Sequence, residues 1–531
     1  MQLSAYPHYP SRRSAILADN MVATSHPLAA QAGLSMLAQG GNAVDAALAT
    51  AIALTVLEPT GNGIGGDAFA IVWDGQRLHG LNASGRAPAT WTPDRFGQAR
   101  AMPFRGWESV TVPGAVSAWV ALSERFGSLD FDALFRPAIT YAEGGFPVSP
   151  VIAALWRRAE VELADQPGFA EAFLPGGRAP SAGERFCAPG QAETLRLIAE
   201  SRGEAFYEGS LAEKIAAYAR AYGAALTAKD LAQHRPEWCG TLSQRFDRFD
   251  LHEIPPNGQG IAALMALGIL SHTNVKDHGP DDTAALHLQI EAVKLALADA
   301  EHFVADPDAM RKVGSEDLLD PDYLARRARL INPDRASVAA VGAPKAGGTV
   351  YLTAADASGM MVSFIQSNYA GFGSGVVVPG TGIALQNRGA GFSLDPTSQN
   401  LVGGGKRPFH TIIPGFLMND EGPVMSFGLM GGPMQAQGHV QMVMRTQIWG
   451  QDVQVAADAP RWRVVKGREV ACETTLPAAT LQALREMGHD IVLEAPDAAF
   501  GFGGAQLIAR LPGGGYAGGS DPRKDGAALG F

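Results

Sequence analysis

A segment rich in helix and strand breakers, followed at once by a strand that would begin with threonine, is the feature that most constrains this chain. Residues 331–348 contain Asn332-Pro333 and the run Gly342-Ala343-Pro344-Lys345-Ala346-Gly347-Gly348, a composition typical of loops. The region before it has helical patterns, and the region after it has short strand patterns beginning near Thr349. The junction is either an ordinary interdomain loop or a site at which Thr349 has a chemical role, and a single Gly-Thr pair does not decide between them.

The rest of the chain predicts a mixture of helices and short strands. Residues 27–58 are expected to form two helices separated by Gly40-Gly41, with Asn42 as N-cap and Asp45 in the first turn of the second helix. The other predicted elements are a buried strand over 68–73, a helix-rich region over 115–330 whose clearest helix is His287–Phe303, strands over Val350–Ala354, Met360–Ile365, Gly382–Leu385 and Ile412–Met418, helices over about 434–450 and 474–487, and a turn-rich tail over 513–531.

Composition excludes several classes of protein. The formal net charge of −11, with no basic run, argues against a nucleic-acid partner. Three widely spaced cysteines, Cys187, Cys239 and Cys472, suggest neither a disulfide framework nor a four-ligand zinc site. The N-terminus lacks an apolar signal segment, and the longest apolar stretch, Ala46–Leu57, is too short to span a membrane. We expect a soluble, cytoplasmic protein without a membrane partner.

Two motifs point to cofactors but lack the context that cofactor binding requires. Gly61-x-Gly63-x-x-Gly66 matches the dinucleotide pattern, but here a helix precedes it and a strand follows, the reverse of the order that aims a helix N-terminus at a pyrophosphate. A nucleotide-dependent oxidoreductase is therefore disfavoured, and a structural turn near the site is expected. His287 and His302 have acidic neighbours but no metal-ligand spacing. No cofactor and no metal are predicted.

The second half of the chain carries a series of short polar and glycine-rich motifs in a fixed order. They are Gly347-Gly348-Thr349-Val350-Tyr351, Gln366-Ser367-Asn368, Gly371-Phe372-Gly373-Ser374-Gly375, Gln386-Asn387-Arg388-Gly389-Ala390-Gly391-Phe392, Lys406-Arg407-Pro408-Phe409-His410-Thr411, Gly431-Gly432-Pro433, Ala459-Pro460-Arg461 and Ser520-Asp521-Pro522-Arg523. Together with Gly40-Gly41-Asn42-Ala43-Val44-Asp45-Ala46 and Gly65-Gly66-Asp67, this series resembles the γ-glutamyltranspeptidase family of N-terminal-nucleophile hydrolases over nearly the whole chain.

The resemblance implies an α+β fold, a four-layer αββα sandwich, made as one precursor. Cleavage between Gly348 and Thr349 would give a large chain, 1–348, and a small chain, 349–531, which form an αβ heterodimer; an (αβ)₂ assembly stays open. Because a free α-amine titrates near pH 8, it can act as general base for its own hydroxyl, and cleavage creates that amine. An uncut binding protein is the alternative, and threonine at position 349 argues against it.

The resemblance also assigns roles around the nucleophile. Gly431 and Gly432 match paired glycines whose N–H groups face the developing oxyanion. Asn368 matches an asparagine near the nucleophile. Transpeptidases have a second threonine that hydrogen-bonds the first; Gln366 stands at its position, and either Gln366 or Ser367 could replace its contact.

The sequence differs from the family pattern at the residues that bind the glutamyl group of the substrate. The aspartate that binds the substrate ammonium is replaced by Gly391, and Arg388 occupies a glutamine position. Since a buried ammonium needs an anion, these changes favour a substrate with a carboxylate and no α-amino group. Arg388 is the first candidate for that carboxylate; a structural ion pair with Asp395 is the alternative.

The remaining substrate-binding candidates follow from the same comparison. Ser84 stands at the family's carboxylate-binding arginine, and Arg86 lies two places later. The paired serines of the family become His410 and Thr411. Arg86 and His410 are weaker candidates for the substrate carboxylate. A hydrolase branch with the pattern N-R-G-x-G-F includes oxamate amidohydrolases, so hydrolysis of oxamate to oxalate and ammonia is the first expectation. Glutathione or γ-glutamyl hydrolysis or transfer, and cephalosporin side-chain hydrolysis, are the alternatives.

Overall fold

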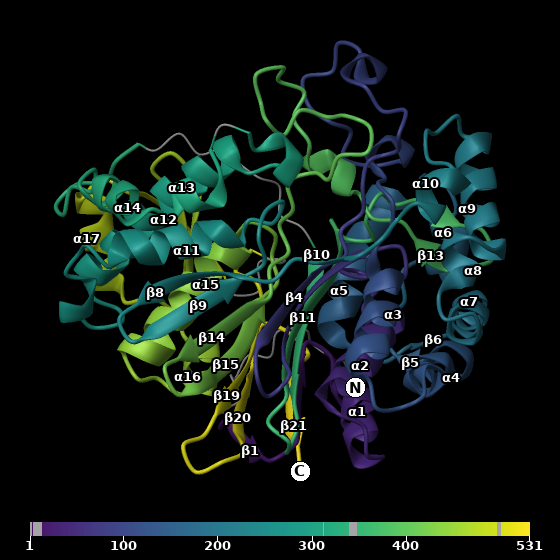
Figure 1. Ribbon diagram of the computed structural model, residues 1–531, viewed down its shortest axis with the longest axis horizontal. Helices are drawn as coiled ribbons and strands as arrows, with labels where there is room; N and C mark the ends of the chain where they lie inside the picture. The colour runs from purple at the N-terminus through teal and green to yellow at the C-terminus, as the bar shows by residue number, and fades with distance from the viewer. Residues whose placement is uncertain (1–2, 4–12, 312, 339–347, 496–500) are drawn as a thin grey trace.

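The computed structural model describes residues 3, 13–311, 313–338, 348–495 and 501–531, and two stacked seven-stranded sheets form its centre (Figure 1). The first sheet has the order β21 (Ala527–Gly530), β2 (Met21–Thr24), β10 (Gly348–Ala355), β11 (Met361–Tyr369), β3 (Asp67–Trp73), β4 (Leu78–Asn82) and β7 (Glu237–Trp238). The second has the order β1 (Ile16–Ala18), β20 (Tyr516–Ser520), β19 (Ala505–Arg510), β15 (Gly422–Leu429), β14 (Gly415–Asn419), β9 (Phe249–Glu253) and β8 (Leu242–Phe246). Neighbouring strands in both sheets are antiparallel.

Helices cover both outer faces and complete the predicted αββα sandwich (Figure 1). On the first sheet, α1 (Pro27–Ala38) packs on β2, and α2 (Ala43–Leu57) packs on β10 and β11. On the second sheet lie α11 (Gly260–Leu270) and α15 (Met434–Val443), and α12 (Thr283–Phe303) packs on α11. The other main helices are α3 (Ala115–Phe126), α4 (Arg136–Gly144), α5 (Pro150–Leu163), α7 (Pro189–Glu200), α9 (Ser210–Ala221), α14 (Pro321–Ala328), α16 (Val453–Asp458) and α17 (Ala478–Glu486).

Three apolar layers hold the four layers of secondary structure together. One lies between the first sheet and its helices, one between the second sheet and its helices, and one between the two sheets, where Phe69, Tyr351 and Ile508 meet. Every residue of α2 is buried, which explains why its sequence lacks a polar face. Its N-terminus is fixed by the predicted cap, because Asn42 and Asp45 form a reciprocal capping box.

Two predicted regions differ from the structure. The helix-rich region 115–330 also contains the hairpin of β8 and β9, whose exposed and buried residues alternate. The tail 513–531, predicted as turns, supplies β20 and β21. Gly514 and Gly515, with φ angles of 94° and 71°, lie in a turn as predicted. The glycines of β20 permit close packing instead: a Cβ on Gly518 would lie 2.3 Å from Met21 Sδ, and one on Gly519 would lie 2.6 Å from the Val453 carbonyl oxygen.

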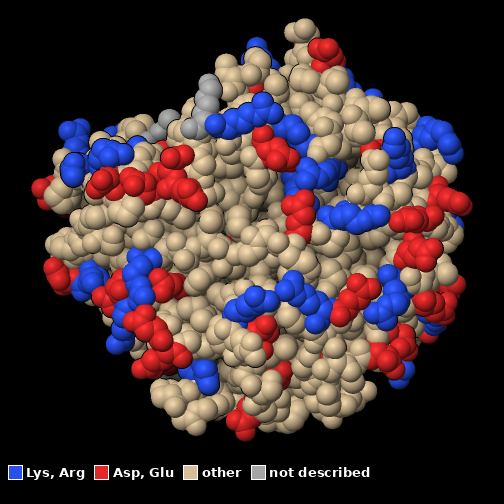
Figure 2. Space-filling model, in the orientation of Figure 1, with Lys and Arg blue, Asp and Glu red and all other residues tan. Residues whose placement is uncertain are grey.

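Surface charge and helix composition are the features that relate to the predictions on nucleic-acid and membrane partners. Among the described residues of the face in Figure 2, cations and anions are interspersed and form no extended basic surface. Within the described ranges, no helix combines the length and the apolar character needed to cross a membrane.

Candidate active site

Thr349 lies at a β-bulge in the centre of the first sheet. The pairing of β10 with β11 shifts by one residue at this point, so that two β11 residues, Ser367 and Asn368, oppose Thr349 alone. Thr349 is buried, 1% exposed, in the uncut chain. The bulge therefore places Ser367 and Asn368, two of the residues predicted to lie near the nucleophile, opposite Thr349.

Ser367 makes the hydroxyl contact with the predicted nucleophile. Its Oγ lies 3.1 Å from Thr349 Oγ1 and donates to the Gly348 carbonyl oxygen at 2.7 Å. Thr349 Oγ1 lies 2.8 Å from that same carbonyl oxygen. Two hydroxyl groups thus converge on the carbonyl of the predicted cleavage site.

Gln366, the other candidate for this contact, is engaged elsewhere. Its Oε1 accepts from Trp119 Nε1 at 2.8 Å, and its Nε2 donates to Asn62 Oδ1 at 2.7 Å. Since both ends of the amide are occupied, Ser367 is the residue that supports Thr349.

The glycine run after α2 passes directly over the nucleophile. A Cβ on Gly61 would lie 3.1 Å from both the nitrogen and the carbonyl oxygen of Thr349. Cβ atoms on Gly63 and Gly66 would each lie 2.8 Å from the side-chain amide of Asn368. The run is a structural turn that requires glycine for close approach, as predicted, with β3 rather than a helix following it.

Arg388 places a buried positive charge beside the site. It begins the short helix η7 (Arg388–Gly391), and its side chain is 1% exposed. Nη1 donates to Thr411 Oγ1 at 2.8 Å, whereas Nε and Nη2 have no hydrogen-bond partner among the described residues. Burial lowers the pKa of Arg388 to about 10, so it remains a cation at neutral pH. The alternative partner Asp395 is exposed and hydrogen-bonds Thr397 instead.

Tyr369 contacts both Ser367 and Arg388. Its backbone N–H donates to Ser367 Oγ at 2.8 Å, and its ring lies 4.7 Å beneath the Arg388 guanidinium carbon. Its φ of 76° is rare for a bulky residue and marks the sharp end of β11. Tyr369 could not be predicted as a site residue from the sequence, because an aromatic residue at a strand end carries no distinctive pattern.

A cavity of about 860 Å³ opens over this group. Tyr369, Thr411 and Pro433 contribute to its lining together with Phe104, Gln259 and Phe392. Thr349 does not line it, but Thr349 Oγ1 contacts Ser367 Oγ, which accepts from the N–H of the lining residue Tyr369. The cavity is thus the space from which a substrate would approach the buried nucleophile.

Gly431 and Gly432 form a turn directly before Pro433, which lines the cavity. Their φ angles are 117° and 62°, which favour glycine. The Gly432 carbonyl accepts from Gln259 Nε2 at 2.9 Å, and Gln259 Nε2 also donates to the Thr411 carbonyl. Within the described part of the chain, neither glycine N–H has a hydrogen-bond partner. Two free N–H groups directly before a residue of the cavity wall suit an oxyanion.

His410 and Arg86 do not occupy carboxylate-binding positions. His410 is fully buried, and its Nε2 lies 3.1 Å from Asp67 Oδ2. Burial, with a smaller effect from nearby arginines, holds the pKa of His410 well below its ordinary value, so it supplies no positive charge. Arg86 is 39% exposed and pairs at 3.2 Å with both Glu237 and Asp306. Of the three basic candidates, Arg388 is the one with buried donor groups that have no partner among the described residues.

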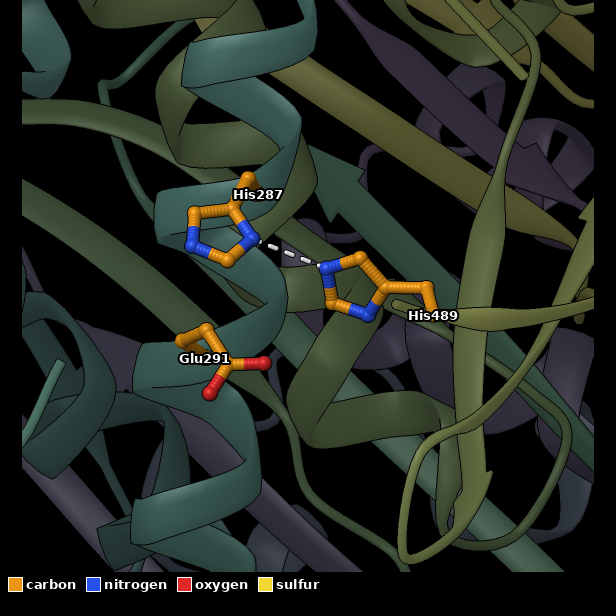
Figure 3. A group of neighbouring side chains, drawn as sticks. All are labelled: His287, Glu291 and His489. Carbon is orange, nitrogen blue, oxygen red and sulfur yellow. Dashed lines mark hydrogen bonds between the residues drawn. The ribbon is translucent and has the colours of Figure 1, made fainter. Parts of the chain in front are cut away.

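A group of possible metal ligands consists of His287 and Glu291 on α12 and of His489, directly before β18 (Asp490–Glu494) (Figure 3). Lys294 can only donate, so His489 Nδ1, 3.5 Å from Lys294 Nζ, accepts. His489 Nε2 then donates to His287 Nδ1 at 2.8 Å, and His287 Nε2 donates to the Asn332 carbonyl at 2.8 Å. Every ring nitrogen of the pair is therefore used.

Glu291, the third member of this group, is equally occupied. Oε1 accepts from Lys294 Nζ at 2.7 Å, and Oε2 accepts from the Ser337 N–H at 3.1 Å. A metal ion would have to displace the buried Lys294 ammonium from Glu291, its carboxylate partner among the described residues. We interpret the group as a hydrogen-bonded anchor for residues 332–337.

Comparison with known proteins agrees with this arrangement. The family model described as gamma-glutamyltranspeptidase matches residues 29–531. The chain belongs to the γ-glutamyltranspeptidase family. It is 38% identical to the oxamate amidohydrolase proenzyme of Klebsiella pneumoniae, over 96% of this chain and 98% of that protein. It is 36% identical to a glutathione hydrolase-like proenzyme of Bacillus subtilis, over 98% and 100%.

A solved structure extends the agreement to the fold. A crystal structure of cephalosporin acylase from Bacillus halodurans superimposes with a TM-score of 0.95 at 48% identity, covering 99% of this chain and 98% of that one. The predicted family, αββα fold and enzyme class are therefore confirmed: the chain is a hydrolase of amide C–N bonds. The relatives differ in the substrates that their names give.

Proposed function

We propose that the protein is a precursor that cuts itself between Gly348 and Thr349. Thr349 Oγ1 attacks the Gly348 carbonyl carbon, the peptide C–N bond breaks, and water hydrolyses the resulting ester. The hydrogen bond from Ser367 Oγ to the Gly348 carbonyl oxygen supports this step, because it stabilises negative charge on that oxygen. The cut gives chains 1–348 and 349–531, held together as an αβ heterodimer by the pairing of β10 with β2.

The free amine of Thr349 then makes the site catalytic. It takes the hydroxyl proton as Oγ1 attacks the substrate amide, and it returns that proton to the departing amine. The N–H groups of Gly431 and Gly432 stabilise the oxyanion. Water hydrolyses the acyl-threonine ester and regenerates the enzyme. Asn368 Oδ1, which has no partner among the described residues, is available to orient the amine.

We infer that the substrate is the amide of an acid without an α-amino group, with oxamate as first choice. The observation that carries this inference is the buried Arg388 guanidinium with two unpaired donor groups. A carboxylate would accept from both, whereas a glutamyl ammonium would lie near this cation and would lack the aspartate that binds it elsewhere in the family. Gly391, which replaces that aspartate, lines the cavity.

A longer acid amide is the second candidate, and the size of the cavity favours it. About 860 Å³ exceeds what a two-carbon acid fills, and the similar structure is that of a cephalosporin acylase. Arg388 holds the carboxylate of either candidate substrate. The two substrates differ only in the length of the chain between the carboxylate and the amide.

Amine release from matched amides tests the proposal. We expect the cleaved enzyme to hydrolyse oxamate or a glutaryl amide, and to act far more weakly on the neutral diamide oxamide. Preference for a γ-glutamyl amide over the glutaryl amide, which differs only by the α-amino group, would contradict the inferred role of Arg388.

A further inference from the structure

Asp67 is a buried carboxylate next to the site, outside the roles described so far. It begins β3, directly after the glycine run, and pairs in register with Ser367 on β11. Its Oδ1 accepts from the N–H of Gly114 at 3.1 Å, and its Oδ2 faces His410 Nε2 at 3.1 Å. His410 Nδ1 accepts from a backbone N–H, so Nε2 carries the proton and donates to Asp67.

Few charges face Asp67. Among the described residues they are the guanidinium groups of Arg388 and Arg407, and the Tyr207 phenol is a further titratable group that interacts with Asp67. Arg407 already pairs with Glu237 at 2.7 Å. Arg388 has no carboxylate within ion-pair distance among the described residues, and the charge that most favours its cationic form is that of Asp67.

The same short segment fixes both charges. His410 hydrogen-bonds Asp67, and the next residue, Thr411, accepts from Arg388. The segment therefore holds the anion and the cation near one another without direct contact, and it leaves two donor groups of Arg388 unpaired.

We propose that Asp67, held by His410, is the counter-ion of Arg388 in the empty site, and that binding of a substrate carboxylate to Arg388 transfers one proton from solvent to Asp67. This rests on the proposed carboxylate site. Two buried carboxylates cannot share one guanidinium without leaving a negative charge unpaired. Burial raises the pKa of Asp67 to about 7, so at about pH 8 it is largely ionised and able to accept the proton.

Asp67 is thereby a positioning and specificity-determining residue rather than a catalytic one. The affinity for an anionic substrate falls as pH rises, roughly tenfold in KM per pH unit above the pKa of Asp67, while kcat is unaffected by this step. A neutral amide does not bring the second negative charge, so its KM does not follow this dependence.

Calorimetric titration of the cleaved wild-type enzyme with oxalate, in two buffers of different ionisation enthalpy, measures the proton uptake directly. We expect about one proton per oxalate at about pH 8, falling toward zero near pH 5, and no uptake in Asp67→Asn. Arg86→Met, which changes a surface arginine, is the matched control and should behave as wild type.

The outcomes distinguish the proposed role of Asp67 from the proposed carboxylate site at Arg388. Oxalate binding without proton uptake in wild type would overturn the role of Asp67 and leave the Arg388 site intact. Absence of oxalate binding would overturn the carboxylate site and this inference together. The wild-type titration decides even if Asp67→Asn does not fold.

Discussion

Replacing Arg388 with methionine separates recognition of the acid from the chemistry of amide cleavage. Arg388 has two donor groups for a carboxylate, and a hydrogen bond between charged groups contributes about 1.5–3 kcal/mol. Loss of both removes about 3–6 kcal/mol, which corresponds to a fall in kcat/KM of roughly 10²–10⁴ for an anionic amide. Methionine has a similar length and needs no hydrogen bond, so the buried position stays filled.

Amine release from oxamate and from oxamide, measured side by side, is the assay. Arg388→Met should lose activity on oxamate while its activity on the neutral oxamide changes by less than about threefold. Arg86→Met, whose guanidinium lies in a surface ion-pair network, is the control and should retain both activities. An equal loss on both amides, in a variant that still cleaves itself, would refute the assignment of Arg388 to the substrate carboxylate.

Four further perturbations test other parts of the account. Ser367→Ala should slow self-cleavage roughly 10²-fold, as loss of an oxyanion donor does, whereas Ser367→Thr keeps the hydroxyl and is the control. Equal cleavage rates of Ser367→Ala and wild type on a denaturing gel would contradict the role of Ser367. Gly61→Ala brings a Cβ to 3.1 Å from the nucleophile backbone and should impair cleavage, while Gly144→Ala, with open space around it, should not. Because burial raises the pKa of Asp67 from 3.8 to about 7, its ionisation destabilises the fold as pH rises through that range. Asp67→Asn should therefore gain stability relative to wild type between about pH 4 and pH 8, on the order of 4 kcal/mol by denaturant titration, and a pH-independent difference would exclude this. Since the histidine pair of Figure 3 uses all its ring nitrogens, a chelator should leave Tm unchanged, and stoichiometric zinc in the purified protein would contradict that assignment.

Local signals in the sequence were sufficient for much of the fold. The α2 cap was predictable because Asn42 and Asp45 satisfy each other within one helical turn. The strand after the glycine run was predictable because β3 is apolar on both faces. The C-terminal strands were not predictable, because their glycines are explained only by the side chains and backbone that pack against them from other elements.

The candidate site also has residues that could be predicted from the sequence and residues that could not. Thr349 and Arg388 stand out in the sequence by their motifs, and the structure links them through two neighbouring residues of β11, since Thr349 contacts Ser367 and Arg388 contacts Tyr369. Choosing Ser367 over Gln366 required the β-bulge, which depends on how two strands pair. Asp67 was visible only as part of a motif, since its partners His410 and Arg388 lie more than 300 residues away along the chain.

Mass spectrometry of the purified wild-type protein beside Thr349→Ala tests most directly the central claim that Thr349 is a self-released nucleophile. The account predicts two wild-type chains, the smaller beginning at Thr349 and ending at Phe531, and a variant that stays whole. A wild type that remains a single chain, a cut at another residue, or a variant that still cleaves would contradict it.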